Sequence, residues 1–340
     1  MNKNKPLLSI CIPTYNRAKY LDRLLSEIVF PCQSQEINIL IFDNGSTDGT
    51  LAILKKYQHN NNLKYFCNDR NEGFDLNILK IFKYDASQYI WLMGDDDLLD
   101  VRYLKEIIAI ILKHPDFGMM YLDSELQEGT PNEFPRMNRS ISYELVDQQT
   151  YCDQVLHKAT LMSSNIINAK YYMPKMINPA CLGRKWLHVH IFLKIADKLA
   201  NIGIKNIIVR EKILKQRTGT ADEKEFVSLF IDDFLATVSL SKVTNVKLNT
   251  FKKQFYFLAI REAILEMGWK IAFVQSLLSF KRLKNEFGMP GYDQIIFILT
   301  TCIYRTVGVK RFKKLKKLFI LSKILPFLRK ILIYGKKHAK

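Results

Sequence analysis

Short apolar runs alternate with amphipathic segments along the first 125 residues of the chain. Each run is five or six residues long and is bounded by turn residues, which is typical of buried strands. The runs are Leu7–Ile12, Ile37–Phe42, Leu63–Cys67, Tyr89–Met93 and Phe117–Leu122. Between them apolar residues recur with helical spacing; in the first such segment they are Leu21, Leu24, Leu25 and Ile28, and Pro31 marks its expected end. Because apolar strands alternate with helices, the pattern predicts a parallel sheet with helices on both faces.

The pattern is less regular in the following part of the chain. Asp123–Arg139 is rich in Glu, Pro, Gly and Asn and predicts a loop. A further strand is predicted at Leu161–Ile167 and a helix at Trp186–Leu199, and from Phe226 onward the pattern is helical and basic. We therefore expect three parts: a β-α half over residues 1–125, a second half over residues 126–225 and a helical, basic region over residues 226–340.

Three consecutive carboxylates, Asp95, Asp96 and Asp97, come directly after the predicted strand Tyr89–Met93 and Gly94. Adjacent carboxylates repel one another and are destabilising unless a cation or hydrogen-bond donors offset them. In an open α/β sheet, ligands bind outside the carboxyl ends of the strands, where this acidic triplet is expected to lie. On these residues alone, a cation site and an acidic turn leading into the next helix both remain open.

Composition and cysteine spacing exclude several classes of protein. The chain has 340 residues, of which 48% are hydrophobic, so a substantial core needs no disulfides or structural metal. Its six cysteines form no CxxC pair and show no regular spacing, which argues against a zinc knuckle or a disulfide framework. The charged N-terminus is followed by an apolar run too short for a signal peptide. We expect reduced cysteines and a protein that is not exported.

Positive charge is concentrated at the C-terminal end of the chain. The formal net charge is +18, and Lys310–Lys340 contains twelve Lys or Arg residues and no Asp or Glu. Such a segment favours an anionic partner, either nucleic acid or lipid. Leu and Ile interleave with the basic residues at helical intervals, without a run of twenty apolar residues, which predicts a helix lying on an anionic membrane surface. The scarcity of stacking aromatics disfavours nucleic acid, while helices packed on the protein's own core remain an alternative.

Four segments in order resemble a known family: LSICIPTYNRAKYL, ILIFDNGSTDGT, NDRNEG with Asn77 four residues after Gly73, and YIWLMGDDDLL. They are similar to the nucleotide-sugar glycosyltransferases of family 2, and most to bacterial enzymes of O-antigen, capsule and lipopolysaccharide synthesis such as the abequosyltransferase-like group. The resemblance covers roughly the first 125 residues. It implies the GT-A fold, a Rossmann-like, mostly parallel sheet flanked by helices. Residues 1–125 would then bind the nucleotide-sugar and residues 126–225 the acceptor.

The resemblance also implies roles for residues on the donor side. Pro13, Thr14 and Tyr15 would wall the nucleotide pocket, and Asp43 would accept a hydrogen bond from a pyrimidine base. Two asparagines, Asn71 and Asn77, are further candidates for the donor side. The alternative is that both asparagines only hold their loop in place.

A divalent cation suits the acidic triplet chemically. Departure of a nucleoside diphosphate leaves negative charge on phosphate, and Mg²⁺ or Mn²⁺ neutralises such charge while binding carboxylate oxygens. By resemblance Asp97 is the expected metal ligand, and Asp95 either joins it or binds the ribose or sugar and assists catalysis through water. Asp96 could take either task.

The expected catalytic base is missing from the linear pattern. Inverting members of the family resembled have an Asp or Glu at the start of a helix well beyond the metal residues, but here that neighbourhood is CLGRKWLHVHIF. His188 or, less favourably, His190 could act as the base, because imidazole titrates near neutral pH. Their spacing of two places them on different sides of a helix. The segment containing Asp222, Glu223 and Glu225 is a fallback that looks like a solvated loop.

These observations combine into one hypothesis. We expect a metal-dependent glycosyltransferase on the cytoplasmic face of a bacterial inner membrane, bound peripherally, which moves a sugar from a nucleoside diphosphate to a lipid-linked glycan. A sugar nucleotidyltransferase would have a Gly-rich loop after its first strand, and PTYNRAKY has no glycine. A non-catalytic basic protein that binds membranes or nucleic acid would have no need of the acidic triplet.

Overall fold

The computed structural model describes residues 5–34, 37–128, 134, 141–158, 161–218 and 233–248. All of them belong to one compact unit formed by Met1–Asp222 and Ser228–Phe255. The predicted halves 1–125 and 126–225 both fall largely in this unit. The basic tail Lys310–Lys340 and the fallback carboxylates Asp222, Glu223 and Glu225 lie outside the described residues.

Four parallel strands form one side of the sheet. They are β1 (Leu8–Thr14), β2 (Asn38–Asp43), β3 (Leu63–Cys67) and β4 (Tyr89–Leu92). All seven residues of β1 are buried, which explains why its sequence is apolar on both faces. The expected strands in this part of the chain are confirmed.

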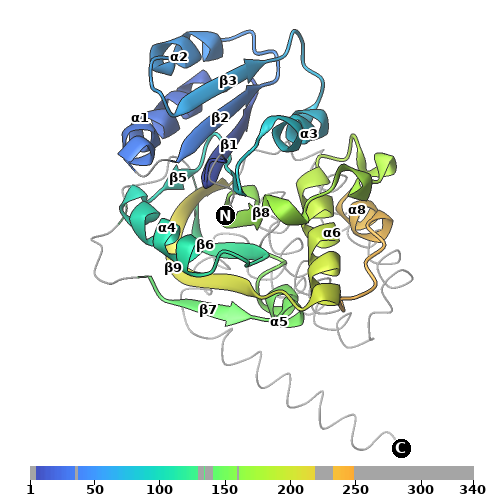
Figure 1. Ribbon diagram of the computed structural model, residues 1–340. Coiled ribbons are helices and arrows are strands. Elements are labelled where there is room, and N and C mark those ends of the chain that lie inside the picture. The colour runs from blue at the N-terminus through green and yellow to red at the C-terminus, as the bar shows by residue number, and fades with distance from the viewer. Residues whose placement is uncertain are drawn as a thin grey trace, which may run out of the picture. The chain divides into compact units, whose positions relative to one another are not determined.

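The other side of the sheet has mixed strand directions. Its strands are β5 (Leu98–Leu99), β6 (Met119–Glu128), β7 (Tyr143–Val146), β8 (Asn165–Asn168) and β9 (Asn206–Thr218). Strand β8 is antiparallel to both β4 and β6, whereas β9 is parallel to β6. Within the described residues the order is β3-β2-β1-β4-β8-β6-β9-β5, with β7 paired to β9 (Figure 1). Among the described strands four pairings are parallel and four are antiparallel, so the predicted α/β sheet is confirmed, but its strands are mixed rather than mostly parallel.

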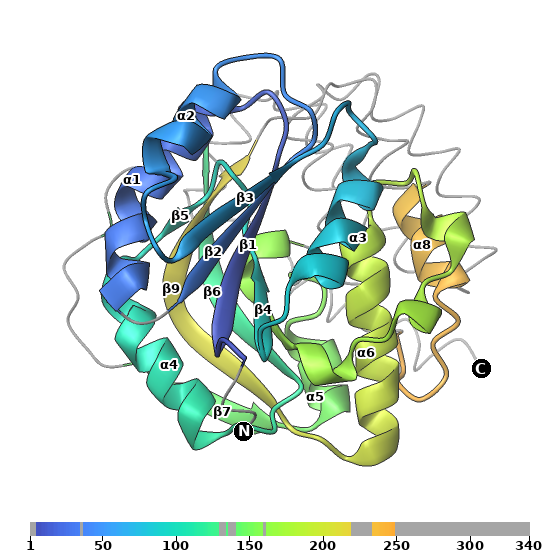
Figure 2. The same ribbon diagram turned by 45° about the horizontal axis from the view of Figure 1, so that its top comes forward.

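Helices cover both faces of the sheet. Helices α1 (Ala18–Ser34), α2 (Thr50–Tyr57) and α4 (Leu104–Lys113) lie on one face, while α3 (Phe74–Tyr84), α5 (Gln148–Gln154), α6 (Leu187–Ile202) and α8 (Phe234–Leu240) lie on the other (Figure 2). The predicted apolar stripe of α1 is fully buried at Leu21, Leu24, Leu25 and Ile28. Among the helices that the structure describes, none has the length and apolar character needed to cross a membrane.

Three predicted boundaries were wrong. Helix α1 continues through Pro31 to Ser34, because Cys32 beyond the proline is fully buried in the core and packing outweighs one lost N–H bond. The predicted loop at Asp123–Arg139 begins too early, since β6 extends to Glu128 through pairing with β9 across a bulge. In the predicted strand Leu161–Ile167, only the last part belongs to β8, which follows a 3-10 helix at Met162–Ser164.

Candidate active site

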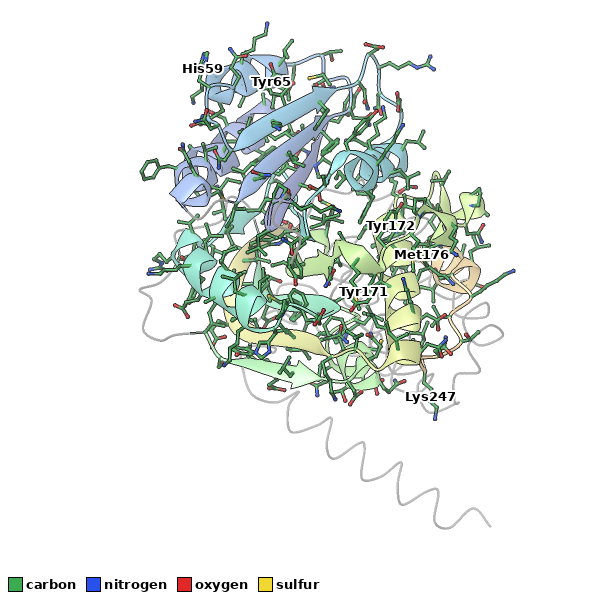
Figure 3. All side chains as sticks on the ribbon, in the orientation of Figure 1. His59, Tyr65, Tyr171, Tyr172, Met176 and Lys247 are labelled. Atoms are coloured by element: carbon green, nitrogen blue, oxygen red, sulfur yellow. The ribbon has the colours of Figure 1, made fainter. Side chains whose placement is uncertain are left out.

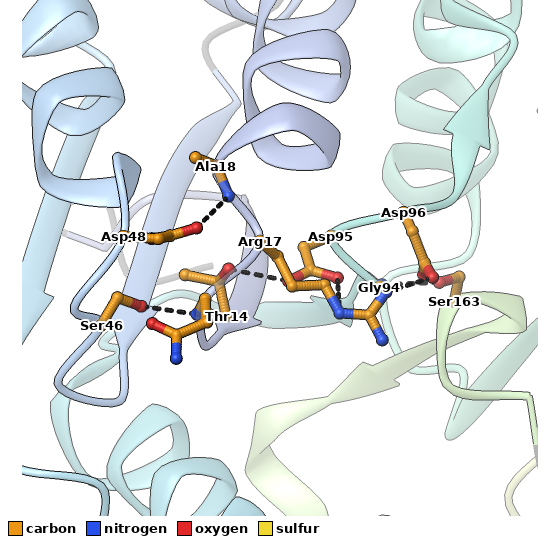
Figure 4. Close-up of polar contacts among 10 residues, drawn as sticks. Thr14, Arg17, Ala18, Ser46, Asp48, Gly94, Asp95, Asp96 and Ser163 are labelled. Carbon is orange, nitrogen blue, oxygen red and sulfur yellow. Dashed lines mark hydrogen bonds and ion pairs between the residues drawn. The ribbon is translucent and has the colours of Figure 1, made fainter. Parts of the chain in front are cut away.

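The acidic triplet lies at the carboxyl end of β4, beside the end of β1. The Thr14 hydroxyl donates a hydrogen bond of 2.7 Å to Asp95 Oδ2, and Arg17 Nη1 donates one of 2.6 Å to Asp96 Oδ2. The Nε atom of Arg17 lies 3.9 Å from Asp95 Oδ1 (Figure 4). Because β1 and β4 are adjacent and parallel, residues 81 positions apart meet at the carboxyl ends of the strands. The interpretation of the triplet as merely a solvated acidic turn does not fit these contacts.

The surroundings of Asp95 shift the pKa of its carboxyl group in opposite directions. Its residue surface is 7% exposed, and burial raises the pKa of its carboxyl group to about 7. The Arg17 guanidinium and the Thr14 hydroxyl act in the opposite direction, because both stabilise the carboxylate form. Positive charge near Asp95 therefore decides whether it is ionised at neutral pH.

Asp97 is held by a segment from the other side of the sheet. The backbone N–H of Gly94 donates to Ser163 Oγ at 2.8 Å, and the Ser163 hydroxyl in turn donates to Asp97 Oδ2. The indole N–H of Trp91 donates to the Ser163 carbonyl at 2.7 Å. The 3-10 helix Met162–Ser164 thus fixes the turn that carries the triplet.

The predicted nucleotide-side residues cluster around the ends of β1 and β2. Pro13 and Thr14 end β1 and are buried, whereas Tyr15 is 40% exposed in the following loop. Asp43 ends β2 and is 3% exposed; its Oδ1 accepts from the backbone N–H of Ser46 at 3.2 Å and also from the Ser46 hydroxyl. The parallel register places Thr14 directly beside Asp43.

Two asparagines hold the loops around Asp43. Asn71 Oδ1 accepts from Asn44 Nδ2 and from the N–H of Gly73, both at 2.8 Å. Asn77 Nδ2 donates to the carbonyl of Phe42 at 2.8 Å. These contacts support the loop-holding alternative, while a donor contact of either side chain stays a prediction.

Close backbone packing at the loop after β2 requires a glycine. Gly45 has φ of 74°, and a Cβ atom there would lie 2.6 Å from the backbone carbon of Arg70. The loops after β2 and β3 therefore meet without an intervening side chain.

The residues at the triplet fit a divalent cation delivered with a diphosphate. Within the described residues, no group of three or more His, Cys, Asp or Glu side chains is arranged to hold a metal. A nucleotide-bound Mg²⁺ takes only one or two protein carboxylates, because phosphate and water supply the other ligands. Asp95 and Asp97 offer hard carboxylate oxygens from a single turn, which suits Mg²⁺ or Mn²⁺.

The two histidines on α6 have different surroundings. His188 is 5% exposed and packs against the rings of Phe74, Trp186 and Phe192, with centroid distances of 5.9, 5.7 and 6.0 Å. Its role as a base stays a prediction.

His190 makes structural contacts through both ring nitrogens. Its Nε2 accepts from the N–H of Asn178 at 3.1 Å, and its Nδ1 lies 2.8 Å from Ser241 Oγ. The Nε2 atom also lies 3.1 Å from the carbonyl oxygen of Met176, so the neighbours of Nε2 include both a donor and an acceptor. His190 is 1% exposed, and Met176, whose carbonyl lies near its Nε2, is labelled in Figure 3. These contacts do not fit the hypothesis that His190 is the base.

A carboxylate that sequence reasoning missed lies at the start of α6. Asp75, from the first turn of α3, accepts from the backbone N–H groups of Lys185 at 3.0 Å and Leu187 at 3.3 Å. Burial raises its pKa, and these backbone N–H groups oppose the increase. The family resemblance led us to look for a carboxylate within the α6 segment, and the fold brings one there from residue 75.

Arg17 and Ser163 were also missed. Arg17 stands in the PTYNR segment, so its position just after β1 was a signal that could have been used. Nothing in the linear pattern marks Ser163, because its contact to Asp97 joins residues 66 positions apart.

The parallel strand ends, the acidic triplet and the buried Asp43 fit the arrangement expected of a GT-A glycosyltransferase. Residues 9–162 match the family described as glycosyl transferase family 2. Together with the similar sequences and structures, this match over nearly half of the chain supports a family 2 glycosyltransferase and disfavours the sugar nucleotidyltransferase alternative.

The relatives include enzymes of bacterial surface polymers. The chain is 38% identical over 126 residues to an abequosyltransferase of Salmonella typhimurium, covering 35% of this chain and 33% of that one. It resembles the crystal structure of Staphylococcus aureus TarS residues 1–349, with a TM-score of 0.54 and 17% identity over 80% of this chain and 78% of that one. A mannosyltransferase of Pyrobaculum calidifontis, solved with GDP-Man and Mn²⁺, gives a TM-score of 0.51 and 12% identity over 89% and 82% of the two chains. The sequence matches span only about a third of the length of the abequosyltransferase and of TarS.

Proposed function

We propose that the protein transfers a sugar from a nucleoside diphosphate, with a pyrimidine base, to a lipid-linked or surface-polysaccharide glycan. The proposal rests on one observation: Thr14, Asp43 and the acidic triplet lie together at the carboxyl ends of the parallel strands. TarS has been solved with UDP and with UDP-GlcNAc, which supports a pyrimidine nucleotide here. The names of the relatives, an abequosyltransferase and a poly(ribitol-phosphate) β-N-acetylglucosaminyltransferase, support a surface polymer as acceptor.

The triplet would receive the diphosphate end of the donor. When bound there, Mg²⁺ or Mn²⁺ would neutralise the charge that develops on the departing phosphate. Asp97 and Asp95 would hold the cation, with Ser163 orienting Asp97 and Thr14 orienting Asp95. Asp43, fixed by Ser46, would accept a hydrogen bond from the base.

The proton of the acceptor hydroxyl needs a base if the reaction inverts configuration. We retain His188 as the proposed base and add Asp75 as a second candidate, because its carboxylate lies at the start of the same helix. Each candidate is replaced by a side chain with a non-titrating amide, His188→Gln or Asp75→Asn, and kcat is measured against pH. Only loss of the base removes the corresponding limb of the pH–rate profile, so the two variants separate the candidates.

The basic tail supports a membrane location for this chemistry. Lys310–Lys340 carries twelve basic residues interleaved with aliphatic ones, which suits anionic headgroups. We propose peripheral binding to the cytoplasmic face of the inner membrane, where lipid-linked acceptors would be available.

The decisive experiment is donor turnover with UDP-, CDP-, dTDP- and GDP-sugars, with and without Mn²⁺ or Mg²⁺. We expect metal-dependent release of one nucleoside diphosphate and its loss by about a thousandfold in Asp97→Ala, since the ligand to the charge-neutralising cation is removed. Asp116→Ala is the control, because that side chain is 80% exposed. Formation of pyrophosphate from a sugar phosphate and a nucleoside triphosphate would instead identify a nucleotidyltransferase, and absence of donor binding would contradict both.

A further inference from the structure

Arg17 contacts two carboxylates of the acidic triplet. Its guanidinium bonds to Asp96 at 2.6 Å, lies 3.9 Å from Asp95 and packs over the Tyr20 ring, 5.5 Å from its centroid. The side chain is 32% exposed, so solvent and ligands reach it. Asp95 and Asp96 thus share one positive charge supplied from the start of α1.

A divalent cation at the triplet would compete with this contact. Both the guanidinium and the cation are attracted to the same carboxylates, and they repel each other at such short range. A cation that binds Asp95 and Asp97 therefore weakens the hold of Arg17 on its present partners. A planar guanidinium released from Asp96 finds a better partner in a diphosphate, whose oxygens match its paired donors.

We propose that Arg17 acts as an internal counter-ion that competes with the divalent cation until a diphosphate arrives. Without nucleotide, Arg17 neutralises Asp95 and Asp96 and keeps metal affinity low. With nucleotide, Arg17 transfers to the diphosphate and the cation takes its place at the triplet. Metal and donor consequently bind with positive coupling, and Arg17 is a positioning residue that produces it. Only the transfer of Arg17 to a diphosphate rests on the proposed function.

The test measures Mn²⁺ binding rather than turnover. Free Mn²⁺ is quantified by electron paramagnetic resonance with the full-length protein, with and without UDP, for wild type, Arg17→Met and Arg17→Gln. Without UDP, we expect both neutral variants to bind Mn²⁺ about tenfold more tightly than wild type, because the competing charge is absent. With UDP, the difference in Mn²⁺ affinity between the variants and wild type becomes smaller, and the variants bind UDP more weakly than wild type does. Arg17→Lys, which retains the charge, remains close to wild type in nucleotide-free Mn²⁺ affinity.

Arg23→Met provides a matched control in α1, six residues after Arg17. Arg23 pairs with Glu27 at 3.8 Å and its side chain is 33% exposed, so this variant removes the same charge at similar exposure away from the triplet. Thermal unfolding checks that each variant is folded. Unchanged or weaker nucleotide-free Mn²⁺ binding in both folded Arg17 variants, or no Mn²⁺ binding by them at millimolar concentration, overturns the proposal. If wild type binds none of UDP, CDP, dTDP and GDP, the proposed function fails, whereas the nucleotide-free comparison still decides the competition.

Discussion

The β1–β4 side and the β6–β9 side of the sheet contribute to the site in different ways. On the β1–β4 side, polar residues such as Thr14, Asp43 and Asp95 end a strand or directly follow one, and parallel pairing brings them together. On the β6–β9 side, strands from distant segments are interleaved in the order β8-β6-β9, and Ser163 reaches the triplet from a short 3-10 helix. The β1–β4 side supplies candidate ligands from residues at or just after strand ends, and the β6–β9 side orients them through contacts between residues far apart in sequence.

Among the tests of this comparison, the largest effect is expected from removing the contact that joins the two sides. Ser163→Ala takes away the hydroxyl that bridges Gly94 and Asp97, so kcat should fall about 10- to 100-fold, as when a partner orienting a metal ligand is lost. Ser163→Thr, which retains the hydroxyl, should recover part of the rate. Steady-state kinetics with saturating donor measure both.

Ser9→Ala is the control for that substitution. Ser9 is fully buried in β1, and its Oγ has no hydrogen-bond partner among the residues that the structure describes, so turnover and stability should remain close to wild type. If Ser163→Ala stays within twofold of wild type, the β6–β9 side does not orient the triplet.

The same contrast explains what the sequence could predict. Strands β1 to β4 were predictable because each is a short, mostly apolar run followed by a turn, and a parallel sheet places their ends together. The family resemblance also depends on these local segments. Topology beyond β4 was not predictable, because β8 pairs with β4 and β6 through contacts that no periodicity records.

Two individual side chains show why the sequence did not predict every residue of the site. Asp75 is one polar residue in an amphipathic helix, and its function at the start of α6 depends on packing between α3 and α6. His190 was the less favoured candidate for the catalytic base, and its ring contacts Asn178 and Ser241. Chemical type alone does not distinguish a buried structural imidazole from a catalytic one.

A smaller effect tests the second contact between the two sides. Asp75→Asn replaces an acceptor oxygen by an amide N–H that faces a buried backbone N–H, so the free energy of unfolding should fall by about 1–2 kcal/mol. Urea denaturation followed by tryptophan fluorescence measures the change. Asp116→Asn, at an 80% exposed side chain, should remain within about 0.5 kcal/mol of wild type. Equal stabilities of the two variants would mean that α3 and α6 are joined by apolar packing alone.

The smallest effect is a pH dependence of stability that comes from the β6–β9 side. Burial lowers the pKa of His190, and burial lowers that of His157 to about 4, so both stay neutral in the folded protein below the ordinary histidine value of 6.5. The unfolded chain then binds more protons than the folded one. The stabilisation is therefore complete above pH 6.5 and is lost as the pH falls through the folded pKa values, with a slope of at most about 1.4 kcal/mol per pH unit for each group.

His190→Gln isolates the contribution of one imidazole to this slope. The variant is expected to be less stable than wild type at pH 7.5, because the bonds to Asn178 and Ser241 are altered, but the difference in stability should narrow as the pH falls below 6.5 and wild type loses the His190 contribution. His59→Gln, at an exposed position after α2 (Figure 3), is the control and should leave the slope unchanged. A gap that stays constant with pH would show that His190 takes up its proton in the folded state, and would return it to consideration as a base.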